Sequence, residues 1–272
     1  MKMYRMITSD LDETLLRADG SISAANIAAI KRATQMGIKF VPNTGRSFLS
    51  IQPLLRRLGL WNQPNQYVIS YNGGAIVENW ENHVLLSREL PYEVAAAVFK
   101  VLQQFDVAIH VYTLRGLAIY HPVAADLAYL KTRGVSATTM RGDFSQFQLG
   151  RIMKVIAMSP SLAVRRAAKA AVEQQVTQPV TCTFSSDRYM EVNPVGVDKG
   201  QATLALGQRL GISPAEIMGI GDNANDLAML EQVGCAVAVQ NASAAAKKVA
   251  THVTTANFES GVSEAIDRWV LN

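Results

Sequence analysis

The stretch MITSDLDETLL, residues 6–16, decides the fold of this chain. Its apolar start predicts a buried β-strand, and two carboxylates, Asp10 and Asp12, follow the strand. Because residues two apart in extended backbone point to the same side, we expect both side chains at the carboxyl end of the strand. Carboxylates that close repel each other unless a cation neutralises them, and Mg²⁺ is a hard cation that prefers oxygen ligands. The alternative is an ordinary acidic turn, since Asp and Thr are common in turns.

The composition indicates a soluble globular protein. The chain has 272 residues, 49% hydrophobic and 18% charged, enough for two domains or one large one. The net charge is +4 and no basic block reads as a nucleic-acid arm. No stretch of about 18 apolar residues predicts a membrane span, and Asp10 and Asp12 argue against a signal peptide. Cys182 and Cys235 lack metal-ligand spacing, so we expect free thiols and a cytoplasmic location.

Strand and helix patterns alternate at both ends of the chain. The expected strands lie at residues 4–9, 38–41, 67–70, 190–192, 217–221 and 236–239, with helical patterns between them and a last helix at about 261–270. Alternation of this kind implies crossover connections and a parallel sheet. The sequence therefore predicts an α/β fold, with a Rossmann-like, mainly parallel core sheet built from residues 1–84 and 188–272.

Residues 85–187 break this rhythm. An amphipathic helix follows Pro91, and residues 107–113 and 117–121 read as a hairpin. Further strands are expected at 153–158 and 180–185. We expect this segment to form a separate α+β domain that is inserted into the first.

Two shorter stretches could bind an anion. Thr44 and Gly45 follow the second strand and precede a helix, so a hydroxyl, an amide and a helix N-terminus could cradle a phosphate. Lys199 stands in the first turn of a predicted helix, where the helix dipole disfavours a cation unless an anion lies nearby. A simple helix cap at Thr44 and a solvated surface lysine are the alternatives.

The stretch GIGDNAND, residues 219–226, follows a buried strand with four polar side chains within five residues: Asp222, Asn223, Asn225 and Asp226. So dense a set of carboxylates and amides suits a hard metal ion. The same letters fit G-x-G-x-x-A, a weak dinucleotide fingerprint. That alternative is disfavoured because the acidic cluster would sit where a pyrophosphate must bind, and residues 236–241 offer no ribose-binding acid.

In chain order, Asp10–Thr14, Asn43–Arg46, Lys199 and Gly221–Asp226 resemble the four motifs of the haloacid dehalogenase (HAD) superfamily. The chain resembles its Cof-type phosphatase branch in particular, which carries a large C2-type cap domain where this chain has residues 85–187. Stretches that also look like this branch are residues 72–74, 191–200 and 257–262. One departure is Glu13, where the branch usually has Gly; it puts the backbone geometry after Asp12 in question and adds negative charge near the entrance.

The resemblance implies a Mg²⁺-dependent phosphatase that acts on small phosphorylated metabolites, with sugar phosphates as the commonest class. It implies that Asp10 is the nucleophile that forms an aspartyl-phosphate and that Asp12 is the general acid and base. The implied metal site is Asp10, the backbone carbonyl of Asp12 and Asp222, and the implied phosphate site is Leu11, Thr44, Gly45, Lys199 and Asn225. Asp226 would support Lys199 or the metal, and the cap would exclude water. A phosphotransferase or mutase and a non-catalytic sugar-phosphate-binding protein remain alternatives.

Overall fold

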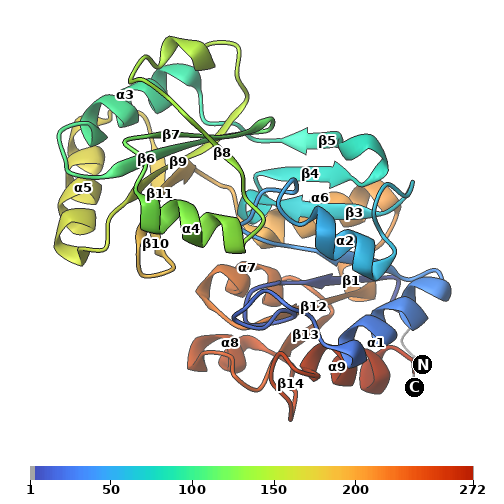
Figure 1. Ribbon diagram of the computed structural model, residues 1–272. Coiled ribbons are helices and arrows are strands. Elements are labelled where there is room, and N and C mark those ends of the chain that lie inside the picture. Colours follow the sequence, from blue (N-terminus) through green and yellow to red (C-terminus); the bar gives the residue numbers. More distant parts are fainter. Residues whose placement is uncertain (1–3, 272) are drawn as a thin grey trace. The chain divides into compact units, whose positions relative to one another are not determined.

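The computed structural model describes residues 4–271, which divide into two compact units (Figure 1). The first unit comprises the described residues up to Ser87 and those from Asp198 on, and the second unit is Arg88–Val197. Two segments far apart in the sequence thus form one unit, and the second unit is inserted between them. None of the helices within residues 4–271 is long and apolar enough to cross a membrane.

A five-stranded parallel sheet forms the centre of the first unit. Its strands, in spatial order, are β14 (His252–Val253), β13 (Cys235–Ala238), β12 (Ile217–Gly221), β1 (Met6–Ser9) and β2 (Lys39–Pro42). All four residues of β1 are buried, as expected for a central strand covered on both faces. Ser9, the last residue of β1, is paired with Pro42 on one side and with Ile220 on the other. The α/β fold with a parallel core sheet is confirmed.

The third expected strand departs from this pattern. β3 (Tyr67–Ser70) pairs antiparallel with β4 (Ala75–Glu78), which pairs with β5 (His83–Ser87) in a separate three-stranded sheet. A single parallel bridge, between Asn43 and Ile69, places β3 next to the end of β2. The expectation that β3 is a full member of the parallel sheet is therefore wrong, because the hairpin partner β4 takes up its hydrogen bonds.

The helices of the first unit pack around this sheet. α1 and α9 lie side by side, because the Asn26 amide donates to the Phe258 carbonyl and accepts from the Ser263 backbone N–H. Ser23 caps α1 by accepting from the Asn26 backbone N–H, as the sequence predicts. The helices are α1 (Ala24–Gln35), α2 (Gln52–Leu58), α6 (Lys199–Leu210), α7 (Leu227–Leu230), α8 (Ala244–Val249) and α9 (Gly261–Trp269), with short 3₁₀ turns at Tyr71–Gly73, Trp80–Asn82, Pro214–Glu216 and Ala224–Asp226.

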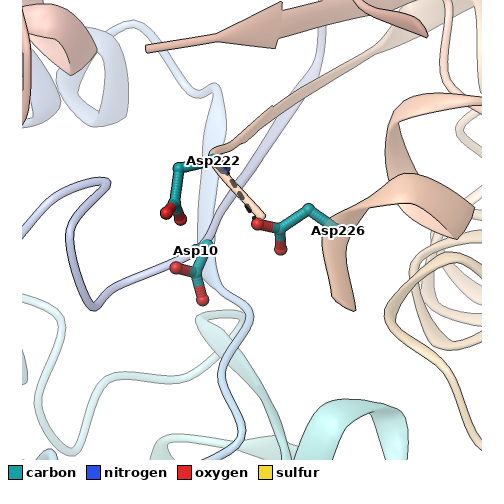
Figure 2. Close-up of side chains that lie close together, drawn as sticks. All are labelled: Asp10, Asp222 and Asp226. Carbon is teal, nitrogen blue, oxygen red and sulfur yellow. Dashed lines mark hydrogen bonds between the residues drawn. The ribbon is translucent and has the colours of Figure 1, made fainter. Parts of the chain in front are cut away.

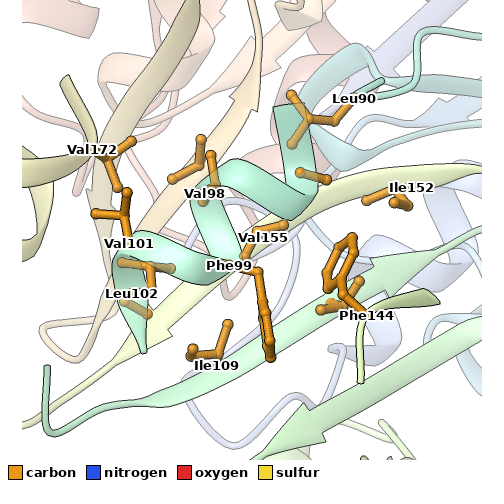
Figure 3. Packing of buried hydrophobic residues seen from close by; sticks show 14 of the residues in the cluster. Leu90, Val98, Phe99, Val101, Leu102, Ile109, Phe144, Ile152, Val155 and Val172 are labelled. Carbon is orange, nitrogen blue, oxygen red and sulfur yellow. The ribbon is translucent and has the colours of Figure 1, made fainter. Parts of the chain in front are cut away.

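The second unit is a six-stranded sheet with its own core. The strand order is β10 (Val180–Ser185), β11 (Tyr189–Pro194), β9 (Ile152–Met158), β6 (Ala108–Thr113), β7 (Gly116–Tyr120) and β8 (Ala137–Thr139), and all pairs are antiparallel except β7 with β8. Its helices are α3 (Tyr92–Leu102), α4 (Ala124–Thr132) and α5 (Leu162–Gln175), with a 3₁₀ turn at Ser145–Phe147. Side chains of α3 such as Val98 and Phe99 pack against Ile109 and Val155 in a separate hydrophobic cluster (Figure 3).

The expected boundary after residue 187 needs correction. The sequence pattern predicts that residues 190–192 belong to the core sheet, but β11 pairs with β10 and β9 of the second unit, and the unit ends at Val197. Met190 and Val192 lie in the hydrophobic cluster of the second unit. Glu191 is buried on the opposite face and is paired with Lys154 of β9 at 2.6 Å. The expected hairpin and the strand at 153–158 do stay outside the parallel sheet.

Candidate active site

The carboxyl ends of β1, β2 and β12 bring three polar loops to one edge of the sheet. The Asp10 backbone N–H donates to the Ile220 carbonyl at 2.9 Å, and the Asn43 N–H donates to the Ser9 carbonyl at 2.8 Å. The parallel ladder therefore continues one residue beyond each strand. Ligands of open α/β sheets bind at this edge.

Three carboxylates gather here, from Asp10, Asp222 and Asp226. All three side chains are buried, and one oxygen of each lies within 4.8 Å of the others (Figure 2). Asp222 and Asp226 come from the loop after β12, and a bond from the Asp222 backbone N–H to Asp226 Oδ2, 2.9 Å long, closes that loop. The loop after β12 thus lies against the end of β1, as the two acidic motifs of the sequence predict.

Lys199 is the cation among these carboxylates. Its Nζ lies 2.5 Å from Asp10 Oδ1 and 2.7 Å from Asp226 Oδ1, and its side chain is fully buried. Burial opposes the positive charge, but the two carboxylates outweigh it, and the pKa of Lys199 lies above its usual value. The alternative of a solvated surface lysine is therefore excluded.

The first turn of α6 holds Lys199 in this place. Asp198 caps the helix by accepting from the Gln201 backbone N–H at 2.8 Å. The Asn43 amide donates to the Lys199 carbonyl at 3.2 Å, from the end of β2. Gly200 lets the helix approach the neighbouring α7, because a Cβ there would lie 2.2 Å from the Ala228 carbonyl oxygen. The helix start is therefore locked to the sheet and to α7.

Negative charge dominates this cluster. Burial raises the pKa of Asp10 well above its usual value, and the charges of Asp222 and Asp226 add to the rise while Lys199 opposes it. Burial likewise raises the pKa of Asp222 to about 6, although a hydrogen bond from Thr14 lowers it. A further cation would relieve both carboxylates.

The donor set fits a divalent metal ion with oxygen ligands. Both oxygens of Asp226 are already engaged, Oδ1 by Lys199 and Oδ2 by the backbone N–H groups of Asp222 and Asn223. Asp10 and Asp222 therefore remain as the side-chain ligands, and Thr14 Oγ1 orients Asp222 through a bond of 2.7 Å. Carboxylate oxygens are the ligands that Mg²⁺ prefers.

The Asp12 carboxylate lies in a more exposed environment than the Asp10 carboxylate does. It is partly exposed and accepts two hydrogen bonds from the Arg46 guanidinium, of which the one from Nε to Oδ2 is 2.8 Å long. A bidentate pair of this kind fixes the plane and orientation of the carboxylate. The residue that resembles a general acid and base is thus held by an arginine from the loop after β2.

Apart from Lys199 on α6, the proposed phosphate-binding residues lie on the three loops at this edge. Thr44 is buried, and its Oγ1 accepts a bond of 3.1 Å from the Arg46 backbone N–H, which leaves the hydroxyl proton to donate elsewhere. Leu11, next to Asp10, has a fully buried side chain. Asn225 is exposed, and its amide contacts Asn72 after β3.

Glu13 takes the backbone conformation that a glycine would take. Its φ is +63°, in the left-handed region that favours glycine. The Asn241 amide donates to the Glu13 carbonyl at 2.8 Å, and the Glu13 N–H donates to the Leu16 carbonyl at 3.1 Å, so both backbone groups are held. The left-handed turn after Asp12 therefore forms with a glutamate in it, at a steric cost.

We expect Glu13→Gly to raise the free energy of unfolding by about 0.5–1 kcal/mol, because it removes left-handed strain that exceeds the added flexibility of the unfolded chain. Glu13→Gln is the matched control, since it removes the charge and keeps the strain. Urea denaturation of both variants measures the difference. A Glu13→Gly protein no more stable than Glu13→Gln would show that the strain of the left-handed turn does not exceed the cost of the added chain flexibility.

Sequence reasoning left two contributors to this site without a role. Arg46 and Thr14 lie inside the quoted motifs, yet their partners Asp12 and Asp222 emerge only in three dimensions. The signal that could have found Arg46 is a cation two residues after the predicted phosphate-binding threonine, at the same sheet edge as two carboxylates.

A parallel α/β sheet with buried carboxylates and a buried lysine at its carboxyl edge is typical of an enzyme of the α/β class. The family model of the haloacid dehalogenase-like hydrolases matches residues 7–266, so this chain belongs to that family. The expected enzyme class, a hydrolase of this superfamily, is thereby confirmed.

Known relatives cover nearly the whole chain. The 5-amino-6-(5-phospho-D-ribitylamino)uracil phosphatase YwtE of Bacillus subtilis is 31% identical over 97% of this chain and 97% of its own length. The HMP-PP phosphatase of Serratia proteamaculans is 28% identical over 88% and 85%. The crystal structure of a haloacid dehalogenase-like hydrolase from Bacteroides thetaiotaomicron superimposes with a TM-score of 0.90 at 25% identity and covers 97% of this chain and 99% of that one.

Proposed function

We propose that this protein is a Mg²⁺-dependent phosphatase that hydrolyses small phosphate monoesters through an aspartyl-phosphate on Asp10. The observation that carries the proposal is the buried cluster at the sheet edge, in which Lys199 contacts Asp10 and Asp226 while Asp222 lies beside them. A structural ion pair would need one carboxylate for one lysine. Three carboxylates around one lysine leave an excess of negative charge, which suits a second cation that can in turn bind an anionic substrate.

In the first half-reaction, Asp10 attacks phosphorus and the bond between phosphorus and the ester oxygen breaks. Asp12 donates its proton to the leaving oxygen, so that the product leaves as an alcohol. In the second half-reaction, Asp12 takes a proton from a water molecule, the water oxygen attacks the aspartyl-phosphate, and inorganic phosphate and the Asp10 carboxylate are released. Asp12 therefore ends each cycle protonated, as it began.

The residues around Asp10 bind and orient the phosphoryl group. We assign Thr44, Gly45, Lys199, Asn225 and the backbone amide of Leu11 to the phosphoryl oxygens, and Asp226 to the support of Lys199, which it contacts at 2.7 Å. The metal would be held by Asp10, Asp222 and the backbone carbonyl of Asp12. When bound, Mg²⁺ supplies charge that offsets the buried carboxylates and the phosphoryl oxygens. Preorganised charges of this kind contribute most to phosphoryl transfer.

The test is phosphate release from a panel of phosphorylated metabolites. Sugar phosphates come first, followed by the compounds in the names of the two curated relatives, since both relatives are called phosphatases. Release of inorganic phosphate without an added acceptor supports a phosphatase. Transfer only when a sugar is added would indicate a phosphotransferase or mutase, and binding without turnover would indicate a sugar-phosphate-binding protein.

The cytoplasmic location and the role of residues 88–197 as a substrate-selecting cap remain predictions.

Removal of the metal is expected to abolish turnover, and added Mg²⁺ to restore it. Asp222→Asn should raise the Mg²⁺ concentration for half-maximal activity by about 10-fold or more, because it removes one of two carboxylate ligands. Titration of phosphate release with Mg²⁺ measures this. Asp19→Asn is the matched control, an exposed carboxylate of the same unit, and should leave the titration unchanged. Full activity in excess chelator would contradict the metal assignment.

A further inference from the structure

The segment that follows β3 is strained and lies against the candidate active site. Tyr71 and Asn72 both have a φ of +55°, two successive left-handed residues with side chains. Such conformations are disfavoured for residues other than glycine and persist where the surroundings hold them, often at functional sites.

The loop after β2, which carries the proposed phosphate-binding residue Thr44, holds Tyr71 and Asn72 in this conformation. The Asn72 backbone N–H donates to the Thr44 carbonyl at 2.9 Å, and the Tyr71 N–H donates to the Arg46 carbonyl at 3.1 Å. The buried Tyr71 hydroxyl donates to Ser47 Oγ at 2.8 Å. Tyr71 and Asn72 thus make three hydrogen bonds to the loop after β2.

The side chain of Asn72 reaches two residues of the proposed phosphate site. A Cβ at Gly45 would lie 3.1 Å from both Oδ1 and Nδ2 of Asn72, so the amide rests directly on the Gly45 backbone. The Asn225 amide, from the loop after β12, donates to Asn72 Oδ1 at 3.4 Å. One amide therefore touches two loops that come from different strands of the sheet.

The next residue ties the segment to the proposed phosphate-binding lysine as well. Gly73 has a φ of +100°, and a Cβ there would lie 2.2 Å from the carbonyl oxygen of Asp198. Asp198 is the cap of the helix that begins with Lys199. The short turn Tyr71–Gly73 thus contacts the loops or helix starts that bear Thr44, Lys199 and Asn225.

We propose that Asn72 is a positioning residue of the phosphoryl-binding site. Its Oδ1 accepts one N–H of the Asn225 amide and so directs the other N–H at the phosphoryl group, while its bulk fixes the backbone of Gly45. This assignment rests on the proposed function and deepens it. Because the residues that Asn72 positions bind the phosphoryl group and not the rest of the substrate, Asn72 affects every substrate and the product, inorganic phosphate, alike.

The test is the binding of inorganic phosphate to the Mg²⁺-loaded protein, measured by calorimetry and as product inhibition. Asn72→Gly keeps the left-handed backbone and removes the amide, and we expect phosphate binding to weaken about 10-fold. Asn72→Asp keeps an acceptor for Asn225 but adds a negative charge, and should weaken phosphate binding further. Turnover on alkyl and aryl phosphates should fall by the same factor, and thermal stability should be retained.

Two controls distinguish positioning from a structural role. Asn62 also has a left-handed backbone, with a φ of +51°, and its Oδ1 accepts a bond of 2.9 Å from the Glu81 N–H. Asn62→Gly therefore makes the same change elsewhere in the unit and should leave phosphate binding unaltered. Since Asn72 acts in part through Asn225, the double variant Asn72→Gly/Asn225→Ala should lose less phosphate binding than the product of the losses of the two single variants.

Each outcome decides the assignment. Unaltered phosphate binding in Asn72→Gly, or multiplied losses in the double variant, would overturn the role of Asn72 while the phosphatase function stands. A parent protein that neither binds phosphate nor releases it from any ester would overturn the proposed function, and the role of Asn72 with it.

Discussion

Asp10→Asn is expected to reduce turnover more than about 10⁴-fold on every phosphate ester, since losses of up to about 10⁶-fold follow removal of the nucleophile in other covalent enzymes. Asparagine keeps the size of the side chain but cannot form the acyl phosphate. The variant should fold, because Lys199 keeps its contact with Asp226 at 2.7 Å and the repulsion between Asp10 and Asp222 is removed.

Rapid-quench labelling with a labelled phosphate donor measures this effect. The parent protein should acquire label on Asp10 within the first turnover, and Asp10→Asn should acquire none. Circular dichroism controls for folding. A folded Asp10→Asn protein that takes up label, or hydrolyses an ester near the parent rate, would refute the nucleophile and the mechanism that depends on it.

Asp12→Asn should produce a different pattern. It removes proton transfer, an effect typically worth about 10²–10⁴-fold, but leaves the nucleophile in place. An aryl phosphate such as nitrophenyl phosphate has a good leaving group that needs little protonation. We therefore expect a detectable phosphorylation step on the aryl ester and loss of most turnover on an alkyl ester. The phosphoenzyme should also persist longer, because its hydrolysis lacks the base.

The comparison of leaving groups needs a control for the lost ion pair with Arg46. Asp267→Asn breaks the exposed pair between Arg32 and Asp267 by the same substitution, and exposed pairs contribute little to stability. It should leave turnover on both esters unchanged. Equal losses of turnover on aryl and alkyl esters in Asp12→Asn would indicate that Asp12 binds the substrate or stabilises the site and does not transfer a proton.

Much of this fold can be predicted from local patterns. The buried run at residues 6–9 and the turn residues after it place Asp10 at the end of a strand, and the same logic places Thr44 and Asp222. The helix caps at Ser23 and Asp198 and the glycine stop at Gly211 are also readable, because each depends on a few neighbouring residues. The inserted segment is visible as a break in the same rhythm.

The choice of strand partner, in contrast, lies outside local sequence. β3 turns back on β4, and β11 joins the sheet of the second unit, although both strands have the apolar pattern of a core strand. A strand of four to six residues has the same periodicity whichever neighbour it pairs with. Its partner is decided by which buried faces fit together, as with Glu191 and Lys154.

The sequence by itself determined which residues reach the sheet edge, because strand ends and loop chemistry are local properties. Only the tertiary structure decided how those residues pair. One oxygen of Asp226 accepts a hydrogen bond from Lys199, and the other accepts from the backbone of its own loop. Asp12 accepts from Arg46, and Asn72 accepts from Asn225. These contacts, apart from the one within the Asp226 loop, join residues between 27 and 153 positions apart. Hydrogen bonds at such separations depend on the relative placement of strands and helices, which no local pattern encodes.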